Sequence, residues 1–233
     1  MSACDMPEYL NEIERLKNKY KAELEIYTGL EIDFLTADYN PSIPYFRQLP
    51  LDYRIGSVHF LPLTGEMKEN AMFCIDGSYA DFEAAVKQNF GGDIKKVVQT
   101  YFDSSMKMVE SGGFDIVGHL DKIYMNGQRF PGFDLTAGWY RSLITEYLHL
   151  IAEKGVIVEI NTKNFRAKRE LYPHPLYLPL LKQLHIPVTV NSDAHYPDLI
   201  NDGRAGAFRL LKETGFVSTC ELVGGEWKEY GLA

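Results

Sequence analysis

One pattern constrains this chain more than any other: short apolar, strand-like stretches run straight into a carboxylate or a histidine. The segments that show it are ELEIYTGLEID, YRIGSVHFL, FDIVGHLDKI, VIVEINTKN and VTVNSDAH. In a parallel barrel the carboxyl ends of the strands meet at one rim, where catalytic groups gather. The recurrence therefore predicts an α/β barrel that carries metal-ligating side chains on one rim.

The side chains at these strand ends offer oxygen and nitrogen donors, a set that Zn, Mn and Fe all accept. They are Glu31, His59, His119, Glu159, Asp193 and His195. A carboxylate can bridge two ions, which a single imidazole cannot, so Glu31 is the best bridging candidate. Asp193 and His195 are two residues apart at a strand end, so both can project from the same face.

Structural roles compete with the metal hypothesis at several of these positions. A single buried histidine is more often a hydrogen-bonded structural residue than a ligand. His59 and His119 are therefore predicted to bind metal only because the same strand-end pattern recurs along the chain. Glu159 is either a ligand or a carboxylate that orients one, and Asn161 either binds substrate or holds its loop. Asp121, after the third strand, is interpreted as a solvated turn carboxylate.

Helical periodicity between the strands predicts an α/β arrangement with a parallel sheet. With 233 residues, 45% of them apolar, the chain can bury one large core, and we expect residues 1–233 to form a single domain. Asp5 and Asp134 are predicted to cap the first helix and the longest one. The expected helices span about 7–20, 93–110, 134–154, 176–184 and 204–214.

Charge and cysteine content limit the partners. A net charge of −8 argues against a nucleic-acid backbone and favours a small-molecule partner. No stretch approaches 18 uninterrupted apolar residues, so no membrane partner is expected. The three cysteines are far apart and form no Cys-x-x-Cys pair, which predicts neither a disulfide framework nor a thiolate zinc site and fits a reducing cytoplasm.

A basic cluster follows the EIN strand end in this acidic chain. Lys163, Arg166, Lys168 and Arg169 lie within seven positions of each other. Such a run is either a solvated face or a contact for phosphate, because guanidinium groups match phosphate oxygens in charge and geometry. Arg166 is the residue we expect to bind phosphate.

The motifs GLEIDF, DYRIGSVHFL, GHLDKI, EINTKNFR and NSDAH, in this order and at these intervals, resemble the histidinol phosphatase branch of the polymerase and histidinol phosphatase (PHP) family. The resemblance runs from about Leu24 to Asp198. It implies a distorted (β/α)7 TIM-like barrel with up to three divalent ions. It also implies hydrolysis of a phosphomonoester, L-histidinol phosphate, in histidine biosynthesis.

The resemblance further implies roles for single residues. Glu31 would bridge two ions, and His59 and His119 would complete one of them. Asp193 would bind the second ion and His195 the third, which makes both catalytic residues. Arg166 would bind the phosphate.

The chain departs from the family at its start. Family members open with a strand that carries His-x-His, whereas this sequence has no histidine before His59. We therefore expect the barrel to lack its first one or two β/α units, and Asp193 and His195 to lack partner ligands.

Two alternatives follow from this departure. The chain is either a truncated or degenerate PHP protein without activity, or a phosphatase for another substrate such as phosphotyrosine. In the first case, exposed strand edges would favour a homo-oligomer.

Overall fold

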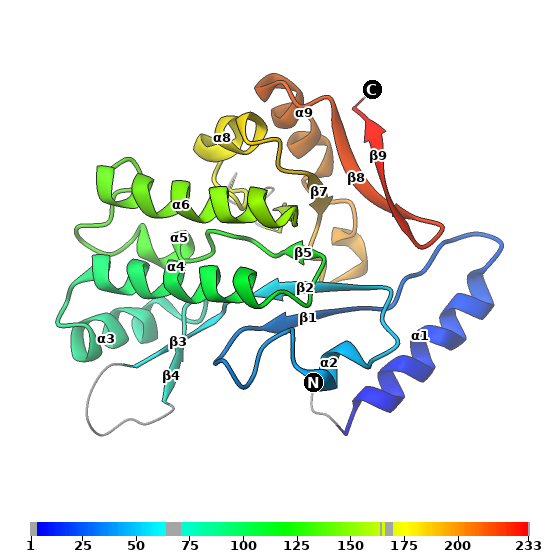
Figure 1. The fold of residues 1–233 in the computed structure, drawn as a ribbon, viewed down its shortest axis with the longest axis horizontal. Helices are drawn as coiled ribbons and strands as arrows, with labels where there is room; N and C mark the ends of the chain where they lie inside the picture. The colour runs from blue at the N-terminus through cyan, green and yellow to red at the C-terminus, as the bar shows by residue number, and fades with distance from the viewer. Residues whose placement is uncertain (1–3, 64–70, 164, 166–169, 233) are drawn as a thin grey trace.

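The centre of the computed structural model is a parallel sheet flanked by helices, and the model describes residues 4–63, 71–163, 165 and 170–232 (Figure 1). The strands, in their order across the sheet, are β1 (Gly29–Asp33), β2 (Tyr53–Ser57), β5 (Ile116–Val117), β6 (Ile157–Asn161) and β7 (Val188–Asn191). Each adjacent pair is parallel. All their carboxyl ends therefore lie at one edge of the sheet, and the predicted α/β class is confirmed.

The sheet of the described residues is open, with β1 and β7 as its edge strands. Two antiparallel hairpins accompany it: β3 (Phe60–Pro62) with β4 (Met72–Cys74), and β8 (Ser218–Val223) with β9 (Glu226–Gly231). The β8–β9 hairpin lies beside β7, and its turn reaches the segment before β1 (Figure 1). There the Gly224 N–H donates to Oε2 of Glu25 over 3.4 Å. The hairpin thus connects the two edges of the open sheet.

Helices make up much of the rest of the described chain. They are α1 (Met6–Tyr20), α2 (Pro44–Arg47), α3 (Tyr79–Asn89), α4 (Ile94–Ser111), α5 (Tyr124–Gly127), α6 (Gly138–Lys154), α8 (Leu178–Gln183) and α9 (Arg204–Thr214), with 3-10 turns at Pro175–Tyr177 and Pro197–Leu199. α4 and α6 lie side by side and bury their apolar faces together (Figure 1). Phe102 of α4 makes edge-to-face contacts with Tyr140 and Tyr147 of α6. The helices and the sheet thus enclose one main hydrophobic core.

Helix ends follow the sequence in part. Gly155 ends α6 in the left-handed conformation, with φ of 65°, as its position predicts. The expected cap at Asp134 is wrong: Asp134 accepts the backbone N–H and the hydroxyl of Thr136, and α6 begins only at Gly138. The side chain of Asp5 likewise makes no cap hydrogen bond on α1. Short-range side-chain bonding in a turn competes with capping at such residues.

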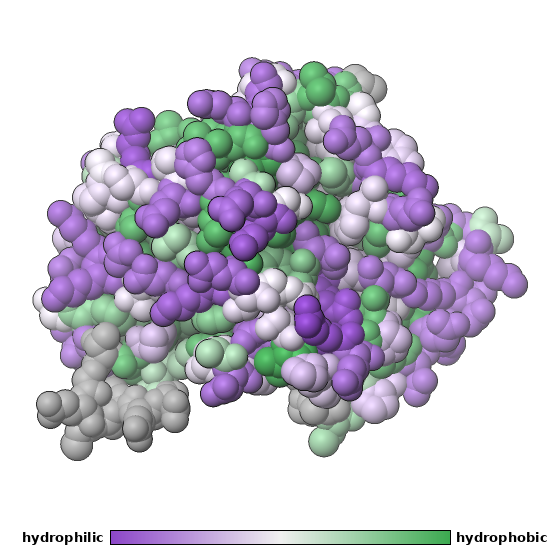
Figure 2. All heavy atoms as spheres, in the orientation of Figure 1, coloured by the Kyte–Doolittle hydropathy of each residue, from purple (hydrophilic) through white to green (hydrophobic). Residues whose placement is uncertain are grey.

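Hydrophilic side chains predominate over α4 and α6 on the face seen in Figure 2. Across the described ranges, no helix combines the length and the apolar character needed to cross a lipid bilayer.

Candidate metal centre

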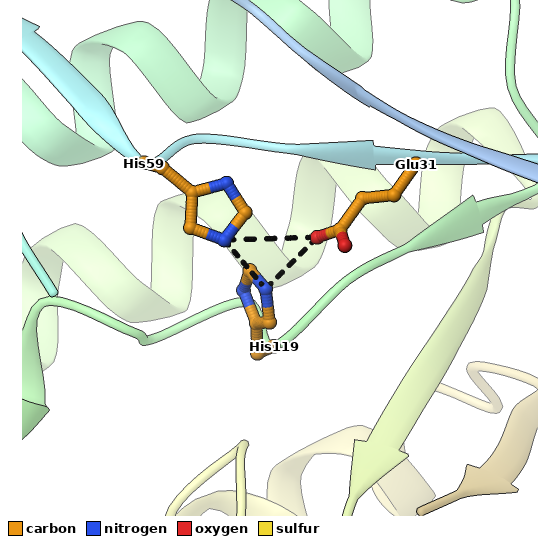
Figure 3. Close-up of side chains that lie close together, drawn as sticks. All are labelled: Glu31, His59 and His119. Carbon is orange, nitrogen blue, oxygen red and sulfur yellow. Dashed lines mark hydrogen bonds and ion pairs between the residues drawn. The ribbon is translucent and has the colours of Figure 1, made fainter. Parts of the chain in front are cut away.

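Three of the predicted residues meet at the carboxyl edge of the sheet (Figure 3). Glu31 lies in β1, His59 follows β2, and His119 follows β5. The Nε2 atom of His119 is 3.1 Å from Oε1 of Glu31 and 3.1 Å from Nε2 of His59. Nε2 of His59 is 3.7 Å from the same Glu31 oxygen. The three donor atoms thus form a triangle with two sides of 3.1 Å and one of 3.7 Å.

This triangle fits a divalent ion. Ligand atoms at tetrahedral angles around zinc, with bonds of about 2.0 to 2.1 Å, are about 3.3 to 3.4 Å apart. Two imidazole nitrogens and a carboxylate oxygen are also a donor set that zinc, manganese and iron accept. Glu31, His59 and His119 could therefore hold one metal ion.

Neighbouring residues hold Glu31 in its ionised form. The hydroxyl of Ser57, on β2, donates to Oε1 of Glu31 over 2.6 Å. Burial by itself raises the pKa of Glu31, but hydrogen bonds from His119 and Ser57 and the charges of His119 and His59 lower that pKa to about 2. Gly118 makes this packing possible, because a Cβ at that position would lie 2.5 Å from Oγ of Ser57.

Asp33 positions His59 and was missed by the sequence reasoning. Its Oδ1 lies 2.8 Å from Nδ1 of His59 and accepts the backbone N–H of His59 over 3.1 Å. Burial lowers the pKa of His59, but the bond to Asp33 and the charges of Asp33, Glu31 and Asp76 together outweigh it, so the pKa is raised above its ordinary value. A proton held at Nδ1 leaves Nε2 free to face the metal. The spacing of two residues from Glu31 on one strand was the available signal.

A buried carboxylate, Glu159, holds the backbone of His119. Oε2 of Glu159 accepts the His119 N–H over 2.9 Å and Nδ2 of Asn161 over 3.1 Å, while Oε1 accepts Nδ2 of Asn191 over 3.1 Å. His119 has a φ of 22°, an unusual value that these bonds help to maintain. Glu159 was predicted either to bind metal or to orient a metal ligand, and its contacts favour the orienting role.

Asp193 and His195 lie together but apart from this triangle. Within the described residues the triangle is the only group of three or more possible metal ligands. The ammonium of Lys163 lies 3.2 Å from Oδ2 of Asp193 and 3.4 Å from Nε2 of His195. Asn161 is buried, and its Nδ2 also reaches Oδ2 of Asp193 over 3.2 Å. The expected metal roles of Asp193 and His195 and the substrate role of Asn161 stay predictions, and Arg166 lies outside the described residues.

Asp121 is not the solvated turn carboxylate that the sequence suggested. It is fully buried, and its Oδ2 accepts the backbone N–H of His174 over 2.7 Å. Burial raises the pKa of Asp121 to about 7. Its neighbour Lys122 is also buried and points toward Asp76, with Nζ 3.6 Å from Oδ2. That oxygen is 3.9 Å from Nε2 of His59, so Lys122 and Asp76 border the metal ligands.

A cavity of about 380 Å³ opens beside the triangle. Glu31, His119 and Asp193 line its polar part, and Tyr53 and Trp227 line its apolar part. The two aromatic rings meet edge to face, 6.4 Å apart. The β8–β9 hairpin therefore forms one wall of the cavity, opposite the strands that carry the ligands.

Known proteins are similar to this chain in sequence and in fold. The chain is 29% identical over 204 residues to the histidinol-phosphatase of Bacillus subtilis, a match that covers 84% of this chain and 72% of that protein. A crystal structure from Listeria monocytogenes superposes with a TM-score of 0.77 at 23% identity, over 88% of this chain and 77% of that one.

The structure of histidinol phosphate phosphatase from Lactococcus lactis, solved with Zn, L-histidinol and phosphate, gives a TM-score of 0.65 at 21% identity. That match covers 96% of this chain and 79% of the other. A model of the PHP domain matches residues 1–163, which is more than half of the sequence. The chain belongs to the PHP domain family.

Proposed function

We propose that this protein is a metal-dependent phosphomonoesterase that hydrolyses L-histidinol phosphate to L-histidinol and phosphate. The convergence of Glu31, His59 and His119 at one edge of the sheet carries the proposal. It is supported by the name of the Bacillus subtilis relative and by the ligands of the Lactococcus lactis structure. A phosphomonoester is small enough for the cavity beside these residues.

A divalent ion held by these ligands would act as a Lewis acid and would lower the pKa of a water molecule for attack on phosphorus. The chain's own groups prepare this site. Ser57 orients the Glu31 carboxylate, and Asp33 fixes the proton of His59 at Nδ1. Glu159 holds the backbone of His119. These contacts restrict the orientations of the ligands, which lowers the cost of assembling the site.

A second candidate is a metal-binding PHP protein that does not turn substrate over. One observation favours it: Asp193 and His195 contact Lys163 and belong to no three-ligand group within the described residues. A third candidate is a phosphatase for phosphotyrosine, which would use the same metal ligands. A comparison of substrates distinguishes it from a histidinol phosphatase.

The test is phosphate release by the zinc- or manganese-loaded protein from L-histidinol phosphate, phosphotyrosine and a phosphodiester. We expect the highest kcat/KM on L-histidinol phosphate. A higher value on phosphotyrosine would move the assignment to the third candidate. Binding of metal without release from any of them would support the second.

We also propose that residues 1–233 form one domain, which the shared hydrophobic core from Phe34 to Leu211 supports. The second part of this proposal is that the protein works in a reducing compartment such as the cytoplasm. The cysteines Cys4, Cys74 and Cys220, all free, support the second.

A further inference from the structure

Lys163 lies where an additional cation would be expected. Its Nζ is 3.2 Å from Oδ2 and 3.3 Å from Oδ1 of Asp193, and 3.4 Å from Nε2 of His195. The Asp193 carboxylate and the His195 imidazole therefore both contact the Lys163 ammonium group. The side chain of Lys163 is 37% exposed, so the ammonium also faces solvent.

The Asp193 and His195 pair is poor in donors for a metal. The pair provides two side chains, whereas catalytic zinc sites keep three protein ligands. His195 also turns its other nitrogen, Nδ1, toward the backbone oxygen of Asp193 at 3.0 Å. A single positive charge from Lys163 is enough to neutralise Asp193, which is the main electrostatic requirement of this pair.

This cluster is connected to the metal ligands. Asn161 reaches Asp193 and Glu159 through the same Nδ2 atom, over 3.2 and 3.1 Å. Glu159 in turn accepts the backbone N–H of His119. Asp193 and His119 also line the same cavity. The Lys163 ammonium and the three metal ligands thus belong to one continuous polar site.

An anionic substrate needs positive charge in this cavity, because its walls are rich in carboxylates. Those that line it are Glu31, Glu159, Asp193 and Glu221. Arg204 also lines the cavity, but its Nη1 donates to the Val190 carbonyl over 2.6 Å and its guanidinium lies over the ring of Phe208. Arg204 is therefore engaged within the protein. Lys163 is linked to the cavity through Asp193, which lines it and lies 3.2 Å from the Lys163 ammonium.

We propose that the Lys163 ammonium is the second cation of this site, in place of a further metal ion between Asp193 and His195, and that it binds a phosphoryl oxygen of the substrate. The phosphoryl contact rests on the proposed phosphatase function, whereas the ion count does not. The site would then combine one divalent ion at Glu31, His59 and His119 with a lysine fixed by Asp193.

The ion count is measured by stripping the metal, titrating with Zn²⁺ and counting bound ions by elemental analysis after equilibrium dialysis. We expect one tightly bound ion per chain. Glu31→Gln should remove it, and Asp193→Asn should leave it in place. Two or more tight ions in the unmodified protein, with one lost in Asp193→Asn, would overturn the inference.

The phosphoryl contact is measured as the affinity of the zinc-loaded protein for inorganic phosphate, by calorimetry. Lys163→Met should weaken phosphate binding about tenfold or more, the usual effect of removing one hydrogen bond to a charged group. Lys163→Arg keeps the charge and should restore most of the affinity. Lys154→Met, at an exposed helix end, is the matched control and should change nothing.

Phosphate binding within twofold of the unmodified protein in a folded Lys163→Met variant would contradict the contact, as would a lack of phosphate binding by the unmodified protein. Thermal melting of each variant establishes that it is folded. Because phosphate binding needs no turnover, an inactive protein that binds phosphate through Lys163 would overturn only the proposed activity.

Discussion

Oδ1 of Asp33 lies 2.8 Å from Nδ1 of His59 and also accepts the backbone N–H of that residue. One carboxylate thus fixes both the ring and the main chain of a candidate metal ligand. The opposite nitrogen, Nε2, then faces Glu31 and His119. Such outer partners raise the basicity of a histidine ligand and set its orientation.

Replacing Asp33 should weaken the metal site. We expect Asp33→Asn to lower zinc affinity about 10- to 100-fold, because the amide cannot support a proton at Nδ1 as a carboxylate does. Competition with a fluorescent chelator measures the affinity. Asp38→Asn, at an exposed loop position on the same segment, is the control and should bind zinc normally. Equal affinities for all three proteins would show that Asp33 plays no part in metal binding.

Glu31 and His195 should differ in their importance for metal. Glu31 belongs to the three-ligand group, whereas His195 is largely exposed and contacts Lys163. Glu31→Gln should therefore lose more bound metal than His195→Ala, as elemental analysis of the purified variants will show. Equal losses would count against the assignment of Glu31 as the principal carboxylate ligand.

Gly118 should tolerate no side chain. A Cβ there would lie 2.5 Å from Oγ of Ser57 and 2.9 Å from Cγ2 of Ile55, so Ser57 would be pushed away from Glu31. We expect Gly118→Ala to lower the free energy of unfolding by about 1 to 3 kcal/mol, and to weaken zinc binding. Gly138→Ala has nothing within 4 Å of the new Cβ and serves as control. Chemical denaturation and zinc titration of both variants test this, and a Gly118→Ala protein that matches the control would refute it.

The ion pair between α1 and the segment before β2 should make stability depend on pH. Oδ2 of Asp52 accepts the Thr28 N–H over 2.6 Å and lies 2.5 Å from Nζ of Lys17. Burial raises the pKa of Asp52, but these two partners outweigh it, so the pKa is lowered in the folded protein. Because the unfolded state then binds the proton more readily, this stabilisation is complete above the unfolded pKa. It is lost as pH falls through the folded value.

Urea denaturation at pH 7 and at pH 3 tests this dependence. The unmodified protein should be more stable than Asp52→Asn at pH 7, and the difference between them should shrink at pH 3. A difference that stays constant with pH would mean that the charge of Asp52 contributes nothing.

The sequence predicted that Glu31, His59 and His119 come together, because their positions follow from strand ends. Glu31, His59 and His119 each lie on or just after a parallel strand, and parallel strands bring such positions to one edge. The α/β class followed from the same alternation of strands and helices. These features depend on local patterns that recur from one strand end to the next.

The partners of these ligands depend on contacts between segments. Asp33 meets His59 across two strands, and Lys163 meets Asp193 across two loops. The burial of Asp121 depends on a segment more than fifty positions away, at His174. Periodicity and composition carry no information on such pairings. An orienting role for Glu159 was one of two interpretations of the sequence, but the contacts of Asp33, Lys163 and Asp121 emerged only from the structure.

Release of inorganic phosphate from L-histidinol phosphate, followed as zinc is added to the metal-free protein, tests the proposed function most directly. We predict that activity rises with added zinc to a plateau at one ion per chain, and that Glu31→Gln shows no such rise. A protein that binds its ion at Glu31, His59 and His119 but releases no phosphate at any zinc level would contradict the proposal.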